Sequence, residues 1–235
     1  MMTVEEIVQQ LNAWGRDSYK KTMLNHGVSE PLFGVKIEDL KKIRKRITKD
    51  YRLALDLYDT GIYDVMYLAG LIADETKMTR KDLRHWLAKA NCTALREYTV
   101  PWVAAESRSG YELALEWIES RKESAATAGW ATLSSFVSVT DDHDLDLKEL
   151  QQFLQRVQKT IHQQPNQVRY LMNGFVIAVG CYVQALTDTA LQIAANIGPV
   201  SVELVGSCKI PFAPEYIQKV RNRGTIGKKR KSTRC

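Results

Sequence analysis

The stretch "KIEDLKKIRKRITKDYRLALDLY", residues 36–58, decides the fold, because its apolar residues recur at intervals of three and four positions. That spacing is the period of an amphipathic α-helix and places the apolar residues on a single face. In the first half of the stretch, the apolar stripe consists of Ile37, Leu40, Ile43 and Ile47. The neighbouring stripe consists of Lys41, Arg44, Lys45 and Thr48. The sequence therefore predicts a helix with one buried face and one cationic face.

The same period runs through nearly every segment of the chain, which has only 6 Pro and 13 Gly among 235 residues. Helices are expected near residues 3–14, 37–48, 50–60, 61–74, 79–90, 92–106, 109–120, 122–138, 145–162, 166–181, 188–197 and 213–222. Their number and length favour stacked antiparallel pairs of the HEAT-like kind. The periodicity alone equally permits a closed helical bundle, since no strict internal repeat is visible. The fold class that the pattern predicts is all-α.

Local signals mark several helix ends. Thr79 and Asp82 form a predicted capping box, and Ser109 is a predicted N-cap. Pro101 is expected to kink or divide its helix, because proline lacks a backbone N–H. The acidic segment "TDDHDLDL", residues 140–147, is expected to form a turn before the next helix.

Composition indicates a compact globular chain that is long enough to bury a sizeable core. Hydrophobic residues make up 45% of the chain and charged residues 26%. The four cysteines show no CxxC spacing and no secretory leader is apparent, so reduced thiols in the cytoplasm are expected. The longest apolar stretch, residues 175–186, is too short to span a bilayer and is expected to be buried core.

Positive charge is concentrated near the end of the chain. The segment from Lys219 to Cys235 carries eight cations and no acid, whereas residues 1–218 hold 25 cations and 27 acids. A polyphosphate or an anionic membrane attracts such a concentration of charge. The competing interpretation of residues 224–235 is an unstructured, solvated tail.

Aromatic rings and nearby carboxylates are candidates for binding and chemistry. Four tryptophans fall on successive predicted helices, namely Trp86, Trp102, Trp117 and Trp130. Core packing is the usual role of such rings. Trp102 and Trp130 lie among Ala and Ser residues, so they could instead stack on a base or face a cationic one. Three carboxylates lie near these rings in the sequence, namely Glu97, Glu106 and Glu123. Each could stabilise a sugar cation or position a water, or could be a solvated surface charge.

The segment "PNQVRYLMNGFVIAVGCYV", residues 165–183, contains a second candidate. Pro165 suits a helix start, and Arg169 and Asn173 then fall four residues apart on one helix face. The two side chains could hold a phosphate or a sugar oxygen. Alternatively, Asn173 satisfies a buried carbonyl and Arg169 pairs with a nearby carboxylate.

No metal or cofactor site is predicted. The four histidines lack metal-ligand spacing, and residues 140–147 lack the full ligand set and glycine of an EF-hand. The chain also contains no P-loop, GxGxxG, GxSxG or HExxH motif. Nucleotide hydrolysis, dinucleotide redox chemistry, esterase activity and zinc proteolysis therefore lose their usual support.

Several stretches together resemble one known family. They are "FGVKIEDLKKIRKRI" (33–47), "LALDLYDTGIYDVMYLAGLIAD" (53–74), "MTRKDLRHW" (78–86), "VPWVAAES" (100–107), "GWATLSS" (129–135), "PNQVRYLMNGFVIAVG" (165–180), "CKIPFAPEYI" (208–217) and "GKKRK" (227–231). The chain is similar in them to the AlkD-like DNA alkylation repair family of bacteria, part of the HEAT-like repeat alkylpurine DNA glycosylase superfamily. The resemblance implies a right-handed superhelix of HEAT-like repeats over residues 1–223, followed by a basic tail at 224–235.

The resemblance also implies that a positively charged concave face wraps duplex DNA. Catalytic relatives cleave the N-glycosidic bond of cationic alkylpurines such as 3-methyladenine and 7-methylguanine, using a Trp and an Asp four residues apart and an Arg on a later helix. This chain departs from that pattern. It has Ala94 or Leu95 at the Trp position, Tyr98 or Thr99 at the Asp position, and no Arg in "AATAGWATLSS", residues 125–135. Glu97, Glu106 and Trp130 are the residues predicted to form a substitute catalytic set.

The sequence thus predicts a DNA-binding protein of the alkylation repair type, either a glycosylase with an altered site or a non-catalytic binder of a lesion or DNA structure. A helical-repeat scaffold for protein partners is the alternative. The expected ligand is double-stranded DNA, with no metal, cofactor or membrane, and the expected state is a monomer in the bacterial cytoplasm at the nucleoid. The predicted DNA contacts are Trp102, Arg169, Asn173, Lys209, Lys228, Lys229, Arg230 and Lys231.

Overall fold

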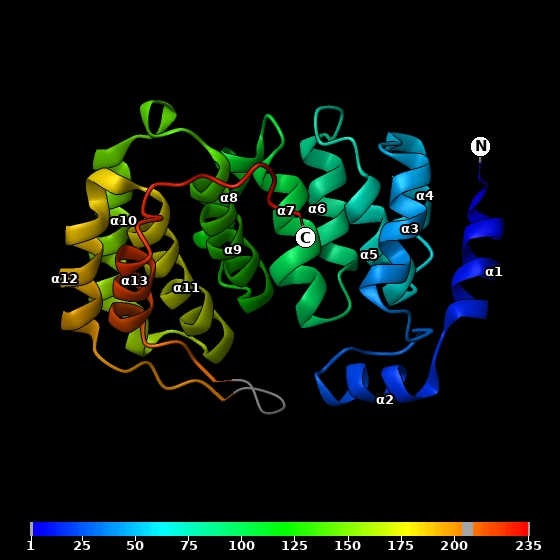
Figure 1. Cartoon of the computed structure of the whole chain (residues 1–235), viewed down its shortest axis with the longest axis horizontal. Coiled ribbons are helices and arrows are strands. Elements are labelled where there is room, and N and C mark those ends of the chain that lie inside the picture. Colours follow the sequence, from blue (N-terminus) through cyan, green and yellow to red (C-terminus); the bar gives the residue numbers. More distant parts are fainter. Residues whose placement is uncertain (1, 204–208, 235) are drawn as a thin grey trace. The chain divides into compact units, whose positions relative to one another are not determined.

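The computed structural model describes residues 2–203 and 209–234, and within these ranges the regular structure consists of helices, with no strand. The chain divides into two compact units, each drawn with its helices in Figure 1. The N-terminal unit comprises the residues up to Gly110 together with Arg234, and the C-terminal unit comprises Tyr111–Thr233. A stack of helix pairs in which each pair contacts only its neighbours can divide in this way. A single domain over residues 1–223 therefore stays a prediction.

The N-terminal unit is built around α5 (Tyr63–Ile72), in which every residue is buried. Its other elements are α1 (Val4–Trp14), α2 (Asp17–Asn25), α3 (Ile37–Ile47), α4 (Tyr51–Tyr58), α6 (Arg80–Lys89), the π-helix η1 (Leu95–Thr99) and α7 (Val100–Ala105). Helix α5 packs against α1, α3, α4, η1 and α7. A helix that packs on all sides needs a largely apolar surface, and in α5 the buried charged residue is Asp64, whose carboxylate is hydrogen-bonded.

The C-terminal unit is built around α11 (Asn166–Tyr182), which packs against α9 (Glu123–Val139), α12 (Thr187–Ile197) and α13 (Ala213–Asn222). The remaining elements are α8 (Gly110–Ile118), α10 (Leu147–Thr160) and three short 3-10 helices at Asp142–Asp144, Ile161–Gln163 and Gln184–Leu186. The predicted core stretch at 175–186 is confirmed, because Phe175, Val176, Val179 and Val183 are fully buried.

The helices predicted from the sequence are present, and the predicted capping box of Thr79 and Asp82 forms at the start of α6. The sequence prediction missed α2. No residue of α2 is buried, and no side chain caps its N-terminus. The apolar periodicity on which the prediction depended is therefore absent from this helix. A smaller correction concerns Ile37, which is exposed at the start of α3 although Leu40 and Ile43 are buried.

The helix predicted at 92–106 is divided, as Pro101 indicated. Residues Leu95–Thr99 form a π-helix, and the N–H of Val100 donates to the carbonyl of Leu95, five residues earlier. In a regular α-helix the Pro101 ring would clash with the carbonyl of Glu97, four residues before it. The wider π turn avoids that clash, and α7 then begins with Pro101 in its first turn.

A buried carboxylate fixes the loop before α3. Asp64, in the first turn of α5, accepts hydrogen bonds from the N–H groups of Phe33 (2.6 Å), Gly34 (3.3 Å) and Val35 (2.8 Å). Gly34 has a φ of 79°, a left-handed conformation that favours glycine. Three successive N–H groups facing one carboxylate form a concave anion-binding turn, here filled by the protein itself.

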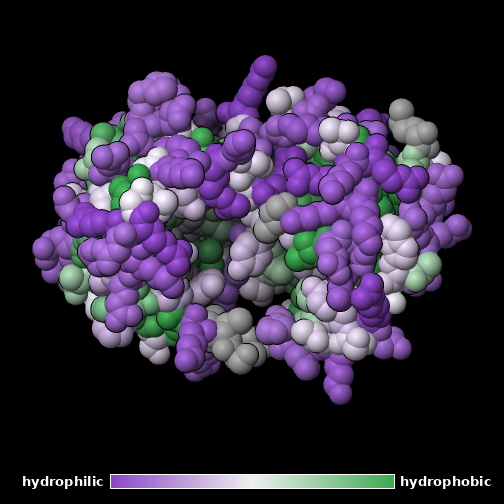
Figure 2. Space-filling view, in the orientation of Figure 1, coloured by the Kyte–Doolittle hydropathy of each residue, from purple (hydrophilic) through white to green (hydrophobic). Residues whose placement is uncertain are grey.

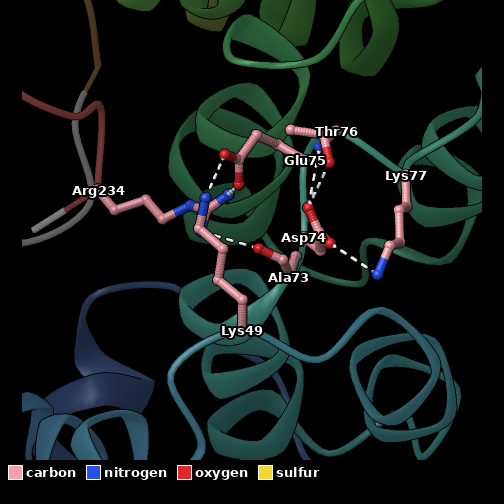
Figure 3. Close-up of polar contacts among 7 residues, drawn as sticks. All are labelled: Lys49, Ala73, Asp74, Glu75, Thr76, Lys77 and Arg234. Atoms are coloured by element: carbon pink, nitrogen blue, oxygen red, sulfur yellow. Dashed lines mark hydrogen bonds and ion pairs between the residues drawn. The ribbon is translucent and has the colours of Figure 1, made fainter.

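A buried ion pair in the N-terminal unit involves Arg234 (Figure 3). Its guanidinium donates to the carbonyl of Ala73 (2.9 Å) and to the carboxylate of Glu75 (2.7 Å). Lys49 pairs with the other oxygen of the same carboxylate. Burial opposes the ionisation of Glu75, but the hydrogen bond from Lys49 and the nearby Arg234 outweigh it and lower the Glu75 pKa.

Cys92 and Cys181 are buried free thiols, whereas Cys208 and Cys235 lie outside the described residues. Burial raises the pKa of the Cys181 thiol to about 11, so it remains protonated at neutral pH.

Over residues 2–203 and 209–234, no single helix has both the length and the apolar character needed to cross a membrane. The helical segments Asn166–Tyr182 and Gln184–Ile197 reach that length and apolar character only when taken together, and the two are bent by 114° relative to each other.

Candidate functional site

The basic tail follows a defined path over the C-terminal unit. Gly224 and Gly227 turn the chain after α13 with φ values of 66° and 75°. The N–H of Gly227 then donates to the carbonyl of Cys181 at the end of α11 (2.9 Å), and the N–H of Arg230 donates to the carbonyl of Ser138 in α9 (2.8 Å). The interpretation of residues 224–234 as an unstructured tail is therefore wrong.

The cations of the tail fall into two groups. Lys229 has protein partners, because its ammonium donates to the carbonyl of Val137 (3.0 Å) and lies 2.8 Å from a carboxylate oxygen of Asp142. Its side chain is only 14% exposed. Lys228, Arg230 and Lys231 are exposed. Among the four cations from Lys228 to Lys231, Lys229 thus anchors the tail and the other three face solvent.

The tail forms one wall of a cleft with a volume of about 390 Å³. Its other walls are α11 and α13, and its lining residues are Gly174, Ile177, Ala178, Cys181, Tyr182, Tyr216, Val220, Thr225, Lys228, Lys229 and Arg230. A side chain added at Gly174 would meet no atom within 4 Å of its Cβ, so this residue leaves the cleft open. The cleft volume falls within the range of about 300–1,000 Å³ that is common for small-ligand pockets.

Two tyrosines line the cleft beside the cations. Tyr216 in α13 is 48% exposed, and Tyr182 at the end of α11 is half-buried. Burial raises the pKa of Tyr182, and the positive charge of Arg230 partly offsets this increase, so the Tyr182 hydroxyl is neutral at physiological pH. Figure 2 shows hydrophilic residues over most of the face that carries α12 and α13. Cations and accessible rings on one surface are the combination that binds unpaired nucleic acid.

Asn173, which was predicted as a contact, and Asn166 both connect α11 to the described residues between α12 and α13. The Asn173 amide is buried and donates to the carbonyl of Pro211 (3.0 Å), which matches the alternative interpretation of this residue. Asn166 donates to the carbonyl of Glu203 and accepts from its N–H, both at 2.8 Å.

Arg169 and Lys209 are the other predicted cations of this unit. The Arg169 guanidinium lies 3.5 Å from the side-chain oxygen of Asn166. Its buried Nε has no hydrogen-bond partner among residues 2–203 and 209–234. Lys209 is exposed, two residues before the Pro211 that Asn173 holds.

The ring of Trp130 is enclosed by the core of the C-terminal unit. It is 1% exposed, its centroid lies 5.2 Å from that of Phe175 and 6.4 Å from that of Phe153, and the Arg156 guanidinium lies 5.7 Å from it. A base has no access to this ring without displacement of the core.

The other predicted residues lie in the N-terminal unit, on or near the π-helix. Glu97 is 7% exposed and has partners within the protein. Trp102 is buried between Tyr67 (5.6 Å, edge-on) and Tyr98 (5.8 Å), and Tyr98 is 43% exposed. Glu106 caps the end of α7 and also has protein partners. Among the rings of Tyr67, Trp102 and Tyr98, that of Tyr98 is therefore the one with a large surface exposed to solvent.

The structure places Lys228, Lys229 and Arg230 at one cleft, and their role as DNA contacts stays a prediction. Sequence reasoning missed the two tyrosines and Gly174. Tyr216 could have been recognised from the sequence. It lies four residues before Val220, so the two side chains share one face of a short helix, and that helix directly precedes the cations. The sequence offered no comparable signal for Gly174.

Comparisons with known proteins agree with this organisation. Residues 7–217 match the family described as DNA alkylation repair enzyme. The uncharacterized proteins Lin0241 of Listeria innocua and Lmo0209 of Listeria monocytogenes are each 32% identical over 229 residues, covering 95% of this chain and 99% of theirs. A solved structure of "a new family of proteins related to the HEAT-like repeat DNA glycosylases with affinity for branched DNA structures" is 34% identical, with a TM-score of 0.92 over 100% of both chains. The predicted HEAT-like all-α fold is confirmed.

Proposed function

Since the chain belongs to the DNA alkylation repair enzyme family, we propose that it binds DNA at branch points and does not excise bases. The structural relative described as having affinity for branched DNA supports this choice of ligand. Its similarity extends over the whole of both chains. We also propose that the protein acts as a monomer in the bacterial cytoplasm, at the nucleoid, where a chromosomal ligand lies.

The observation that carries the proposal is the row of exposed cations at Lys228, Arg230 and Lys231, held on a fixed main chain. The main-chain hydrogen bonds of Gly227 and Arg230 position the row before any ligand arrives. Little conformational entropy is then lost when phosphates bind. A branch point gathers phosphates from several helices, so a short cationic row meets a higher charge density there than on one duplex.

The site residues argue against base excision. The position at which a catalytic Trp is expected holds Ala94 or Leu95, and the position of the Asp holds Tyr98 or Thr99. None of these residues is acidic, and Leu95 and Thr99 are fully buried. The Trp130 ring is enclosed by core residues. A glycosylase must place a carboxylate or another polar group against the reacting sugar to stabilise its developing positive charge.

Two measurements on the wild-type protein test the proposal. The affinity for a four-way DNA junction is expected to exceed that for a linear duplex of the same length and base composition. Incubation with duplexes containing 7-methylguanine or 3-methyladenine is expected to release no free base. Equal affinity for junction and duplex, or enzymatic base release, would contradict the proposal. Absence of binding to any DNA at low salt would favour the protein scaffold.

Replacing Lys228, Arg230 and Lys231 together with alanine is expected to weaken junction binding by about one to two orders of magnitude at low salt. The slope of log affinity against log salt concentration should become shallower by roughly one unit per lost phosphate contact. Fluorescence anisotropy over a salt series measures both quantities.

The matched control removes three exposed cations of the same unit that do not line the cleft, namely Arg121, Lys148 and Lys159. The net charge changes equally in the two variants. If the control variant loses as much junction affinity as the tail variant, the affinity depends on the overall charge of the unit and the tail has no specific role.

A further inference from the structure

We propose that the cleft between α11, α13 and the tail receives one unpaired nucleotide of a branched DNA, with its base beside Tyr216 and Tyr182 and its phosphate at Lys228 and Arg230. This inference rests on the proposed DNA-binding function and specifies what that binding surface recognises.

The lining residues give the cleft a cationic side and an aromatic side. The tail supplies the positive charge of Lys228 and Arg230, while α11 and α13 supply the rings of Tyr182 and Tyr216. A nucleotide has the complementary division, with an anionic phosphate on one side of the sugar and a flat aromatic base on the other. Stacking on tyrosine tolerates any base, so the cleft would select an unpaired nucleotide without selecting its sequence.

The floor of the cleft leaves room for a base because it is made of small residues. Gly174 and Ala178 lie four residues apart on α11, on the face turned to the cleft. A Cβ at Gly174 would meet no atom within 4 Å. This glycine therefore differs from Gly180 on the same helix, where a Cβ would lie 2.5 Å from the Ile217 side chain. Close packing accounts for a glycine at 180 but not at 174.

The cleft is also stable enough to act as a preformed site. Lys229 is fixed by Val137 and Asp142, and Gly227 by Cys181, so the cationic wall is held from both α9 and α11. A base that enters the cleft must leave the duplex stack, which is costly when the base is paired. At a branch point an unpaired nucleotide carries no such cost, which is why the cleft favours branched over linear DNA.

The test uses two versions of a four-way junction, one fully paired and one with a single unpaired 2-aminopurine at the branch. The wild-type protein is expected to bind the second version about tenfold more tightly, since base–aromatic stacking makes a contribution of that order. The fluorescence of 2-aminopurine, which stacking quenches, should fall on binding.

Gly174→Leu is the decisive variant, because it fills the cleft without meeting another atom at its Cβ. It is expected to lose the quenching and the preference for the junction with the unpaired nucleotide, which is about tenfold in the wild type. Gly174→Ala, which adds only a methyl group, should retain both. Tyr216→Ala, at an exposed ring, should reduce both without changing the thermal stability.

The outcomes separate the two proposals. If Gly174→Leu and Tyr216→Ala keep the preference and the quenching, or if the wild type shows neither, the nucleotide site is overturned while junction binding stands. If the wild type binds no branched DNA at all, both the function proposed above and this site are overturned.

Discussion

Replacing Arg234 with alanine is expected to lower the free energy of unfolding of the N-terminal unit by about 3–5 kcal/mol. The guanidinium is buried and holds both the Ala73 carbonyl and the Glu75 carboxylate (Figure 3). Without it, the buried carboxylate is left with Lys49, whose side chain is 47% exposed, and with a backbone N–H, and the Ala73 carbonyl loses the guanidinium donor. Urea denaturation followed by circular dichroism measures the change.

Lys231→Ala is the matched control for Arg234→Ala, because Lys231 is an exposed cation three residues earlier. Its expected effect on stability is within about 0.5 kcal/mol. Similar losses in the two variants would mean that the buried pair contributes little and that general tail charge matters instead. Replacing Glu75 and Arg234 together should cost less than the two single losses added, since neither group is then left without its partner.

Acid should weaken the same ion pair in the wild-type protein. The Glu75 pKa lies below its usual value of 4.5 in the folded state, so the carboxylate contributes stability above pH 4.5. That contribution is lost as the pH falls from 4.5 through the lower, folded-state pKa. The Glu75→Gln variant should therefore show a smaller decrease in stability over this acid range than the wild type does.

Asp64→Ala is expected to have an effect of similar size, about 4 kcal/mol, because it leaves three N–H groups without their shared acceptor and each buried donor costs about 1–3 kcal/mol. Phe33, Gly34 and Val35 all donate to this carboxylate. Denaturation of the variant by urea tests the estimate, and hydrogen exchange at residues 33–35 should become fast.

The control for Asp64→Ala is Asp56→Ala, in which the lost carboxylate is exposed on α4. It is expected to change the free energy of unfolding by no more than about 0.5 kcal/mol. Retention of slow exchange at residues 33–35 in Asp64→Ala would show that the loop holds its conformation without the carboxylate.

The fold was predictable because most helices bury one face. The apolar repeat identified α3 through Leu40 and Ile43, and it identified the long buried stretch of α11. It could not identify α2, whose residues are not buried and carry no repeat. It also could not identify the π turn at Leu95–Thr99, because that turn depends on how the helix accommodates Pro101 rather than on which face is apolar.

The candidate site was predictable in its charge but not in its geometry. The composition of the tail pointed to Lys228, Arg230 and Lys231, which are exposed. It could not distinguish Lys229, whose partners Val137 and Asp142 lie far away in the sequence. The carboxylate of Asp64 was missed for the same reason, since its donors come from a loop some thirty positions earlier. Contacts of this kind arise from tertiary packing and leave no local period.

The main-chain anchoring of the tail has a consequence for how recognition could change. Because peptide groups at Gly227 and Arg230 set its path, the side chains at positions 228, 230 and 231 can be exchanged without redirecting the chain. Point mutations at these three positions would therefore alter ligand preference while leaving the scaffold intact. The tail is a natural place for divergence among homologues, and a practical place to install new specificity by design.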